Sequence, residues 1–262
     1  MHVFEYATGS VPLIISMPHS GSFIPEDIHE QMTKEGQKSK DTDWFVEQLY
    51  AFAKARGVYW LQSNYSRYVI DLNRSPDDVA LYPGRDTTEL CPTSTFDKAP
   101  IYQHNNVPNH AEIASRITNY WLPYHHQLQN AISEITNTYG FVIVLEAHTI
   151  ASRVPRFFTG QLSDFNFGTN NGQSCTAELL TALKALDFGA YSVVFDGTFK
   201  GGYITRHYAK PHENIFTIQL ELSQAVYMNE ETSEWSASKA GDCEPYLVKL
   251  IDTLLNWSPQ AK

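Results

Sequence analysis

Short apolar runs alternate with segments of helical periodicity along most of this chain. The apolar runs lie at residues 11–17, 57–62, 68–72, 141–145, 191–195 and 215–222. The run at 141–145 is apolar without alternation, which is typical of a strand covered on both faces. The segments between the runs carry apolar side chains three or four positions apart, the period of an amphipathic helix. They cover residues 43–56, 109–138, 174–186 and 244–257. This pattern predicts a three-layer α/β fold, with helices on both faces of a mostly parallel or mixed central sheet.

The composition is that of a folded protein. Hydrophobic residues make up 42% of the 262 residues, which is enough for a sizeable core. No shift in composition marks a boundary, so we expect a single domain over residues 1–262. The formal net charge is −10 and the basic residues form no stripe, which argues against a nucleic-acid partner.

Membrane and export signals are weak in this sequence. The apolar stretches fall far short of the ~20 residues that span a bilayer, and the first residues do not resemble a signal peptide. The 3 cysteines are widely spaced, so neither a disulfide framework nor a CxxC metal site is expected. We therefore expect a cytoplasmic protein without a membrane partner.

Two features interrupt the alternation of strands and helices. Pro123 lies inside the segment 109–138, which predicts a kink or a break into two helices. Irregular stretches rich in Pro, Asn, Gly and Thr occupy residues 75–108 and 157–173. Loops of this length commonly cover a site, so we expect these two to close over a ligand.

Polar residues follow four of the predicted strands. His19 comes after the first run, Asn73 and Arg74 after the third, and His148 after the fourth, while Glu221 lies at the end of the sixth. In an open parallel sheet, ligands bind outside the carboxyl ends of the strands. We therefore expect these side chains to converge on one crevice.

His19 and His148 are the leading candidates for metal ligands. Two histidines and one carboxylate form the ligand set typical of catalytic zinc, with a fourth position left for water. Asp43 is the favoured carboxylate, although it could instead cap the helix that follows it. Taken alone, a histidine at a strand end is more often a capping or hydrogen-bonding residue than a metal ligand.

Glu221 is the leading candidate for a general base. A carboxylate at the end of an apolar strand must be paired or must take part in chemistry. The structural alternative is an ion pair with an arginine, and Glu146 is a competing candidate for the base.

The arginines indicate the kind of ligand. Only eight occur, and four of them lie in or beside the strand-end motifs: Arg67, Arg74, Arg153 and Arg206. Guanidinium groups recognise carboxylates in bidentate fashion, so we expect a pocket for a small anionic molecule. Gly202, in a glycine pair before Arg206, would let the backbone approach that ligand closely, although such a pair is also common in ordinary turns.

Six stretches between residues 17 and 228 resemble the N-formylglutamate amidohydrolase family. They read Met-Pro-His-Ser-Gly at 17–21, Thr-Asp-Trp at 42–44, Ser-Arg-Tyr-Val-Ile-Asp-Leu-Asn-Arg at 66–74, Glu-Ala-His-Thr at 146–149, Gly-Gly-Tyr-Ile-Thr-Arg-His-Tyr at 201–208 and Gln-Leu-Glu-Leu-Ser-Gln-Ala-Val-Tyr-Met at 219–228. The long strings that contain arginine are the specific ones. The resemblance implies a phosphorylase/hydrolase-like fold related to zinc-dependent exopeptidases and the hydrolysis of N-formyl-L-glutamate in histidine degradation.

The resemblance also implies roles for particular residues. One Zn²⁺ would be held by His19, Asp43 and His148, and Glu221 would be the general base. From the chemistry of amide hydrolysis, we expect zinc and one arginine, Arg67 or Arg153, to stabilise the tetrahedral oxyanion. Loss of one such donor typically raises the barrier by about 3 to 4 kcal/mol. Asn73 with Arg74 would bind one substrate carboxylate, and Arg206 the other. Two alternatives stay open: a metal-dependent deacylase of another N-acyl amino acid, such as formyl- or acetyl-aspartate, and a binding module for anions without a metal.

Overall fold

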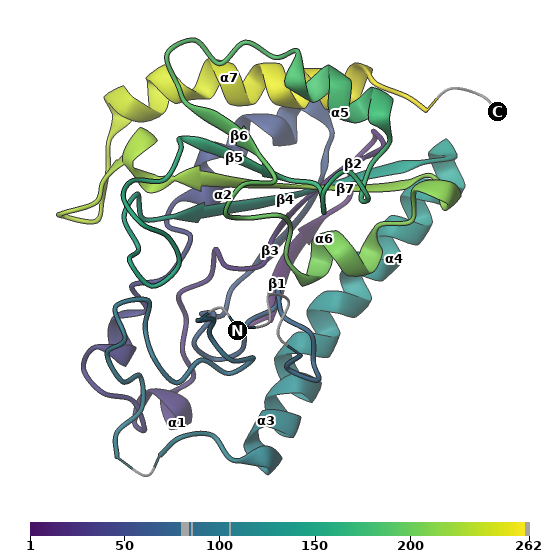
Figure 1. Ribbon diagram of the computed structural model, residues 1–262. Helices are drawn as coiled ribbons and strands as arrows, with labels where there is room; N and C mark the ends of the chain where they lie inside the picture. Colours follow the sequence, from purple (N-terminus) through teal and green to yellow (C-terminus); the bar gives the residue numbers. More distant parts are fainter. Residues whose placement is uncertain (80–83, 85, 105, 260–262) are drawn as a thin grey trace.

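A seven-stranded mixed sheet forms the centre of the computed structural model (Figure 1). The structure describes residues 1–79, 84, 86–104 and 106–259. The strand order is β1-β3-β2-β4-β7-β5-β6, in which the β1–β3 and β5–β7 pairs are antiparallel and the others are parallel. The strands are β1 Phe4–Ala7, β2 Leu13–Met17, β3 Tyr59–Ser63, β4 Val142–Ile150, β5 Phe165–Gly168, β6 Val193–Phe195 and β7 Ile215–Ser223, and a separate hairpin pairs β8 Met228–Asn229 with β9 Glu234–Trp235.

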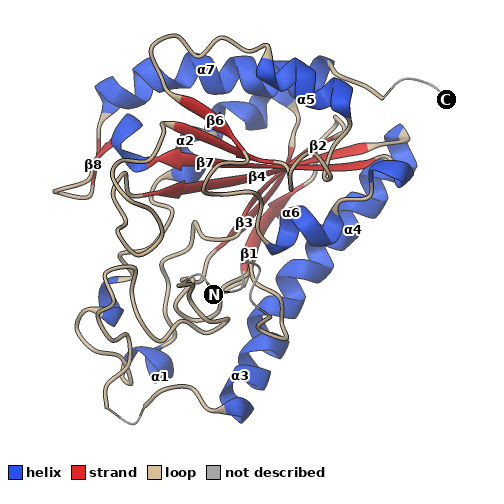
Figure 2. Cartoon of the chain, in the orientation of Figure 1, coloured by secondary structure: helices blue, strands red, loops and turns tan. Residues whose placement is uncertain are grey.

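Helices cover both faces of this sheet (Figure 2). They are α1 Glu26–His29, α2 Val46–Leu49, α3 His110–Arg116, α4 Leu122–Tyr139, α5 Ala177–Lys184, α6 Tyr203–Tyr208 and α7 Ala237–Asn256. Alternate side chains of β4 enter two separate cores, because neighbouring residues of a strand point to opposite faces. Ile143 and Leu145 pack with Leu250 of α7, whereas Val144 packs with Leu128 of α4. The predicted three-layer α/β fold is confirmed.

The sequence prediction of a strand at residues 68–72 is wrong. This segment forms turns and loop, and its backbone bonds to other loops, as when the amide of Asp71 donates to the carbonyl of Leu90 at 2.7 Å. Its side chains are buried all the same, with Val69 and Ile70 in the core beneath α4. The apolar run therefore reflects burial rather than pairing in a sheet.

Several other elements differ from the sequence prediction. The segment 157–173, expected to be irregular, contains β5, and β1 and α6 were not predicted. The helix expected at 43–56 is shorter, because α2 gives way to a 3₁₀ segment, Ala51–Arg56, while α7 begins seven residues before position 244. The expected interruption near Pro123 takes the form of a π-helical segment, Ile117–Trp121, that joins α3 to α4 just before the proline, and the helical run continues through it.

The long loop 75–108 includes positions 80–83, 85 and 105, which lie outside the described residues. The prediction that this loop closes over a ligand therefore falls partly outside the described residues. Among the helices that the structure describes, none is both long enough and apolar enough to cross a membrane.

His125 on α4 fixes the loop that leads to the strand-end residues. It is buried and stacks on Trp121 with ring centroids 3.6 Å apart. Its Nε2 lies 2.8 Å from the carbonyl oxygen of Leu72, and its Nδ1 lies 2.9 Å from the hydroxyl of Tyr208. Because a carbonyl only accepts, Nε2 carries the proton and Nδ1 accepts from the tyrosine. This imidazole is neutral.

We expect His125 to weaken the fold in acid. Burial lowers the pKa of His125 to about 3, against roughly 6.5 in an unfolded chain, so the unfolded state takes up the proton first as the pH falls. The free energy of unfolding should therefore decrease by about 1.4 kcal/mol per pH unit through this one group between about pH 6 and pH 4. Urea unfolding of the wild type and of His125→Gln at several pH values measures that slope. An identical pH dependence in the two proteins would contradict the assignment.

Candidate active site

Two imidazoles and one carboxylate meet at the carboxyl ends of β2 and β4. They belong to His19, Asp43 and His148, all buried, and one ligand atom of each lies within 4.8 Å of the others. His19 follows β2, His148 lies within β4, and Asp43 lies in the turn before α2. The amide of Asp43 donates to the carbonyl of His19 at 3.0 Å, which ties these two segments together.

Asp43 contacts both imidazoles and does not cap the following helix. Its Oδ2 lies 2.8 Å from Nδ1 of His148 and 3.9 Å from Nδ1 of His19. The N-cap of α2 is Phe45, and no side chain makes a capping bond there. The sequence left open whether Asp43 is a cap or a ligand, and this geometry favours the ligand.

The other ring nitrogen of each histidine faces a second carboxylate. Nε2 of His19 lies 2.6 Å from Asp71, and Nε2 of His148 lies 2.7 Å from Glu146. Burial alone would lower the pKa of His148, but Glu146 and Asp43 outweigh burial and raise this pKa well above its usual value. Asp71 is held in turn by the guanidinium of Arg67 at 2.7 Å. The pKa of Asp71 lies well below its usual value, because its close contacts with His19 and Arg67 outweigh the effect of burial.

Glu221 lies beside His148 in the sheet. The parallel pairing of β4 and β7 sets Glu221 opposite His148 and Gln219 opposite Glu146. Burial raises the pKa of the Glu221 carboxyl to about 8, and the nearby Asp43 adds to this rise while His148 opposes it. A carboxyl group with a pKa near neutrality is suited to transfer protons.

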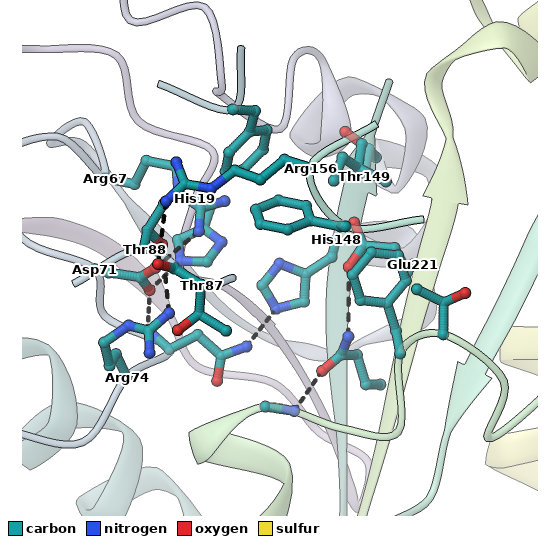
Figure 3. Close-up of a pocket in the computed structure, with 18 of the residues that line it drawn as sticks. His19, Arg67, Asp71, Arg74, Thr87, Thr88, His148, Thr149, Arg156 and Glu221 are labelled. Carbon is teal, nitrogen blue, oxygen red and sulfur yellow. Dashed lines mark hydrogen bonds and ion pairs between the residues drawn. The ribbon is translucent and has the colours of Figure 1, made fainter. Parts of the chain in front are cut away.

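A cavity of about 330 Å³ opens in front of these residues. Figure 3 shows Arg67, Asp71 and Arg74 on one side of the pocket, with His148 and Glu221 on the other. Among the described residues, the buried Nε atoms of Arg67 and Arg74 have no hydrogen-bond partner within the protein. Unpartnered guanidinium donors of this kind suit an anionic ligand.

The structure brings some of the predicted arginines to the pocket and places others elsewhere. Arg153 is exposed, donates to Gln161 at 3.1 Å and is not among the described residues that line the cavity. Arg206 lies on α6, where its Nε donates to the carbonyl of Gly201 at 2.9 Å, and it too is absent from the described lining. Both were predicted from their proximity to strand-end motifs in the sequence, and their side chains point to other partners.

Arg156 lines the pocket and was not predicted. Its guanidinium donates to the side chains of Asp86 and Ser94 and to the carbonyl oxygens of Thr87 and Thr95. It therefore joins the loop after β4 to residues 86–95. The aromatic side chains of Phe96, Phe157 and Phe199 in the same wall were also missed. An isolated arginine or phenylalanine in a long loop gives no sequence signal, whereas Asp71 lay within a motif that was already noted.

Gly202 and Asn73 lie in close contact. The amide of Gly202 donates to Oε1 of Gln219 at 2.7 Å, and a Cβ at this glycine would lie 2.3 Å from Nδ2 of Asn73. That same Nδ2 lies 3.0 Å from Nε2 of His148. The side chain of Asn73 can reach His148 only because position 202 has no side chain.

We therefore expect Gly202→Ala to fold but to lose activity. The added methyl group displaces the Asn73 amide, and a shift of about 1 Å in a site can cost roughly 100-fold in rate. The expected result is a 10- to 100-fold lower kcat/KM with an unchanged circular dichroism spectrum. Gly241→Ala on α7, where a Cβ meets nothing within 4 Å, serves as the control. Full activity in Gly202→Ala would contradict the role given to this contact.

The fold and the site together define a class. The chain is an α/β protein with a candidate metal centre and an arginine-lined pocket at the carboxyl ends of its parallel strands. The family model described as N-formylglutamate amidohydrolase matches residues 11–228. The chain belongs to the N-formylglutamate amidohydrolase family, which confirms the resemblance seen in the sequence.

Relatives over the whole chain agree with this assignment. The chain is 39% identical over 258 residues to an N-formylglutamate deformylase of Pseudomonas aeruginosa, with 97% of each chain covered. It is 38% identical over 261 residues to an N-formylglutamate deformylase of Pseudomonas putida, with 98% of this chain and 97% of the relative covered. A crystal structure of N-formylglutamate amidohydrolase from Ralstonia eutropha JMP134 superposes with a TM-score of 0.81 at 26% identity, covering 96% of this chain and 98% of the other.

Proposed function

We propose that this protein hydrolyses N-formyl-L-glutamate to L-glutamate and formate. The observation that carries the proposal is the position of the His19, Asp43 and His148 group next to Glu221 in an arginine-lined pocket. The names of the two Pseudomonas relatives support this substrate. A dicarboxylic substrate also accounts for several guanidinium groups in one cavity.

The three ligand residues fit one Zn²⁺ per chain. Two imidazoles and a carboxylate are a donor set of catalytic zinc sites, and their ligand atoms already lie close together. Cobalt, nickel or iron would also be accepted by these donors. When bound, zinc lowers the pKa of a water molecule from 15.7 to about 7 and so supplies hydroxide at neutral pH.

Glu221 acts as the general base in this proposal. It lines the pocket next to His148 but lies outside the group of ligand atoms, so its carboxyl group is not needed to hold the metal. Glu221 takes the proton of the water that attacks the formyl carbon and returns it to the departing glutamate nitrogen.

Arg67 and Arg74 bind the negative charges of the reaction. Arg67 is anchored by Asp71 through one terminal nitrogen, while its buried Nε has no partner among the described residues. We assign this guanidinium to the oxyanion that forms at the formyl group. Asn73 and Arg74 bind one substrate carboxylate. Arg153 and Arg206, expected from the sequence to bind the oxyanion and the second carboxylate, are not among the described residues that line the cavity.

Formate release tests the proposal. The purified protein is given N-formyl-L-glutamate, N-formyl-L-aspartate or N-acetyl-L-aspartate, and kcat/KM is measured for each. One methylene group in a fitted pocket changes kcat/KM by roughly 10- to 200-fold. We therefore expect kcat/KM for N-formyl-L-glutamate to exceed that for the aspartate derivatives by at least about 10-fold. A higher kcat/KM for an aspartate derivative would indicate a related deacylase, and substrate binding without turnover would indicate a binding module.

A further inference from the structure

Glu146 is a buried carboxylate that cannot reach the substrate. It is 0% exposed and is not among the described residues that line the cavity, although Glu221 and His148 both are. It lies two residues before His148 on β4, so both side chains extend from the same face of the sheet. The sequence could not decide between Glu146 and Glu221 as the base, and their positions separate the two roles.

Three donors surround the Glu146 carboxylate. Its Oε1 faces Nε2 of His148 at 2.7 Å, and its Oε2 accepts from the amide of Thr205 at 3.1 Å and from the hydroxyl of the same threonine. Thr205 is itself buried, and its carbonyl oxygen accepts from the hydroxyl of Thr217 on β7 at 2.6 Å. Both carboxylate oxygens are therefore occupied as acceptors, which holds this side chain in one orientation.

The two histidines of the ligand group share one arrangement. Each turns Nδ1 toward Oδ2 of Asp43 and Nε2 toward a second carboxylate, Asp71 for His19 and Glu146 for His148. With a metal bound, a proton on Nε2 directed at the carboxylate would leave the lone pair of Nδ1 for the side where the ligand atoms converge. The Nδ2 of Asn73, 3.0 Å from Nε2 of His148, is then a contact without a hydrogen bond. A carboxylate or carbonyl behind a ligating histidine fixes the tautomer and orientation of the ring, and its loss typically costs 10- to 100-fold in metal affinity.

We propose that Glu146, itself oriented by Thr205, is a positioning residue that holds His148 with Nδ1 directed at the metal. This inference rests on the metal dependence in the proposed function. It assigns α6 a part in the site, because Thr205 belongs to that helix. Glu146 thereby acts on the metal through His148, whereas Glu221 acts on the substrate.

Variants at position 146 test the proposal. A glutamine has one acceptor oxygen and one amide nitrogen, so it cannot accept from His148 and from Thr205 at once. We expect Glu146→Gln to bind zinc 10- to 100-fold more weakly than the wild type, as measured by competition with a chelator. We expect excess zinc to restore most of its kcat. Glu146→Asp keeps the charge, so its zinc affinity should lie between those of the wild type and Glu146→Gln.

Variants at position 205 provide a second, milder test. Thr205→Val removes the hydroxyl donor at nearly constant volume and should weaken zinc binding severalfold, while Thr205→Ser keeps the donor and should bind zinc as the wild type does. Thermal unfolding of the metal-free proteins serves as a control for folding. If Glu146→Gln does not fold, the difference in zinc affinity between Thr205→Val and Thr205→Ser tests the proposal instead.

Three outcomes would overturn the inference. They are wild-type zinc affinity in Glu146→Gln, or in Thr205→Val where Glu146→Gln does not fold; a loss of kcat that saturating zinc does not restore; and a wild-type protein that binds no divalent metal. Failure of the proposed function looks different: the wild type would bind zinc without releasing formate from N-formyl-L-glutamate, while the differences in zinc affinity among the variants would persist.

Discussion

Glu221→Gln is expected to keep its zinc and to lose turnover by about 100- to 10,000-fold, the range that a positioned general base contributes. The amide has nearly the same size as the carboxylate, so the 7% exposed side chain can stay in place. It cannot accept the proton of the attacking water. Zinc content per chain measures whether the metal is kept, and the kcat for formate release measures the loss of turnover.

A matched control exists for the Glu221 variant. Glu234 lies on β9 and is exposed, so Glu234→Gln makes the same chemical change away from the pocket. It should leave both zinc content and kcat unchanged. Wild-type turnover in Glu221→Gln would show that another group takes the proton.

The second large effect is expected at the metal ligands. His19→Ala and His148→Ala each remove one of three ligand side chains, so we expect zinc below stoichiometry and formate release reduced to background. The loss differs from that in Glu221→Gln, because metal and activity disappear together. In His148→Ala the carboxylates of Asp43 and Glu146 also lose the imidazole that separates them, and buried charges without a partner destabilise a fold by about 3 to 5 kcal/mol.

His126→Ala is the control for these two variants. His126 lies on α4, is exposed and should tolerate alanine with full zinc content and activity. Stoichiometric zinc together with normal turnover in either ligand variant would remove that histidine from the site.

The sheet could be predicted from the sequence where the apolar runs coincide with pairing. The runs at 141–145 and 215–222 became β4 and β7, which pair along nine positions at the centre of the sheet. The run at 68–72 is also mainly apolar but forms a buried loop, since side-chain burial alone does not reveal where backbone hydrogen bonds go. β5 is only four residues long and contains a polar and a glycine position, so its pattern was too short to detect.

The ligand group could be predicted because strand ends converge. His19, Asp43 and His148 are far apart in the sequence but share the carboxyl edge of parallel strands. The arginines were harder to place, because a long side chain can point several ways from one backbone position. Arg153 and Arg206 turn to other partners, while Arg156 reaches the pocket.

Anomalous diffraction at the zinc edge, from crystals of the zinc-loaded protein, tests the central claim most directly. We expect one peak per chain, about 2.0–2.2 Å from a nitrogen of His19, a nitrogen of His148 and an oxygen of Asp43. A peak bound by other residues, or no peak in a protein that releases formate at its normal rate, would contradict a metal-dependent mechanism at this site.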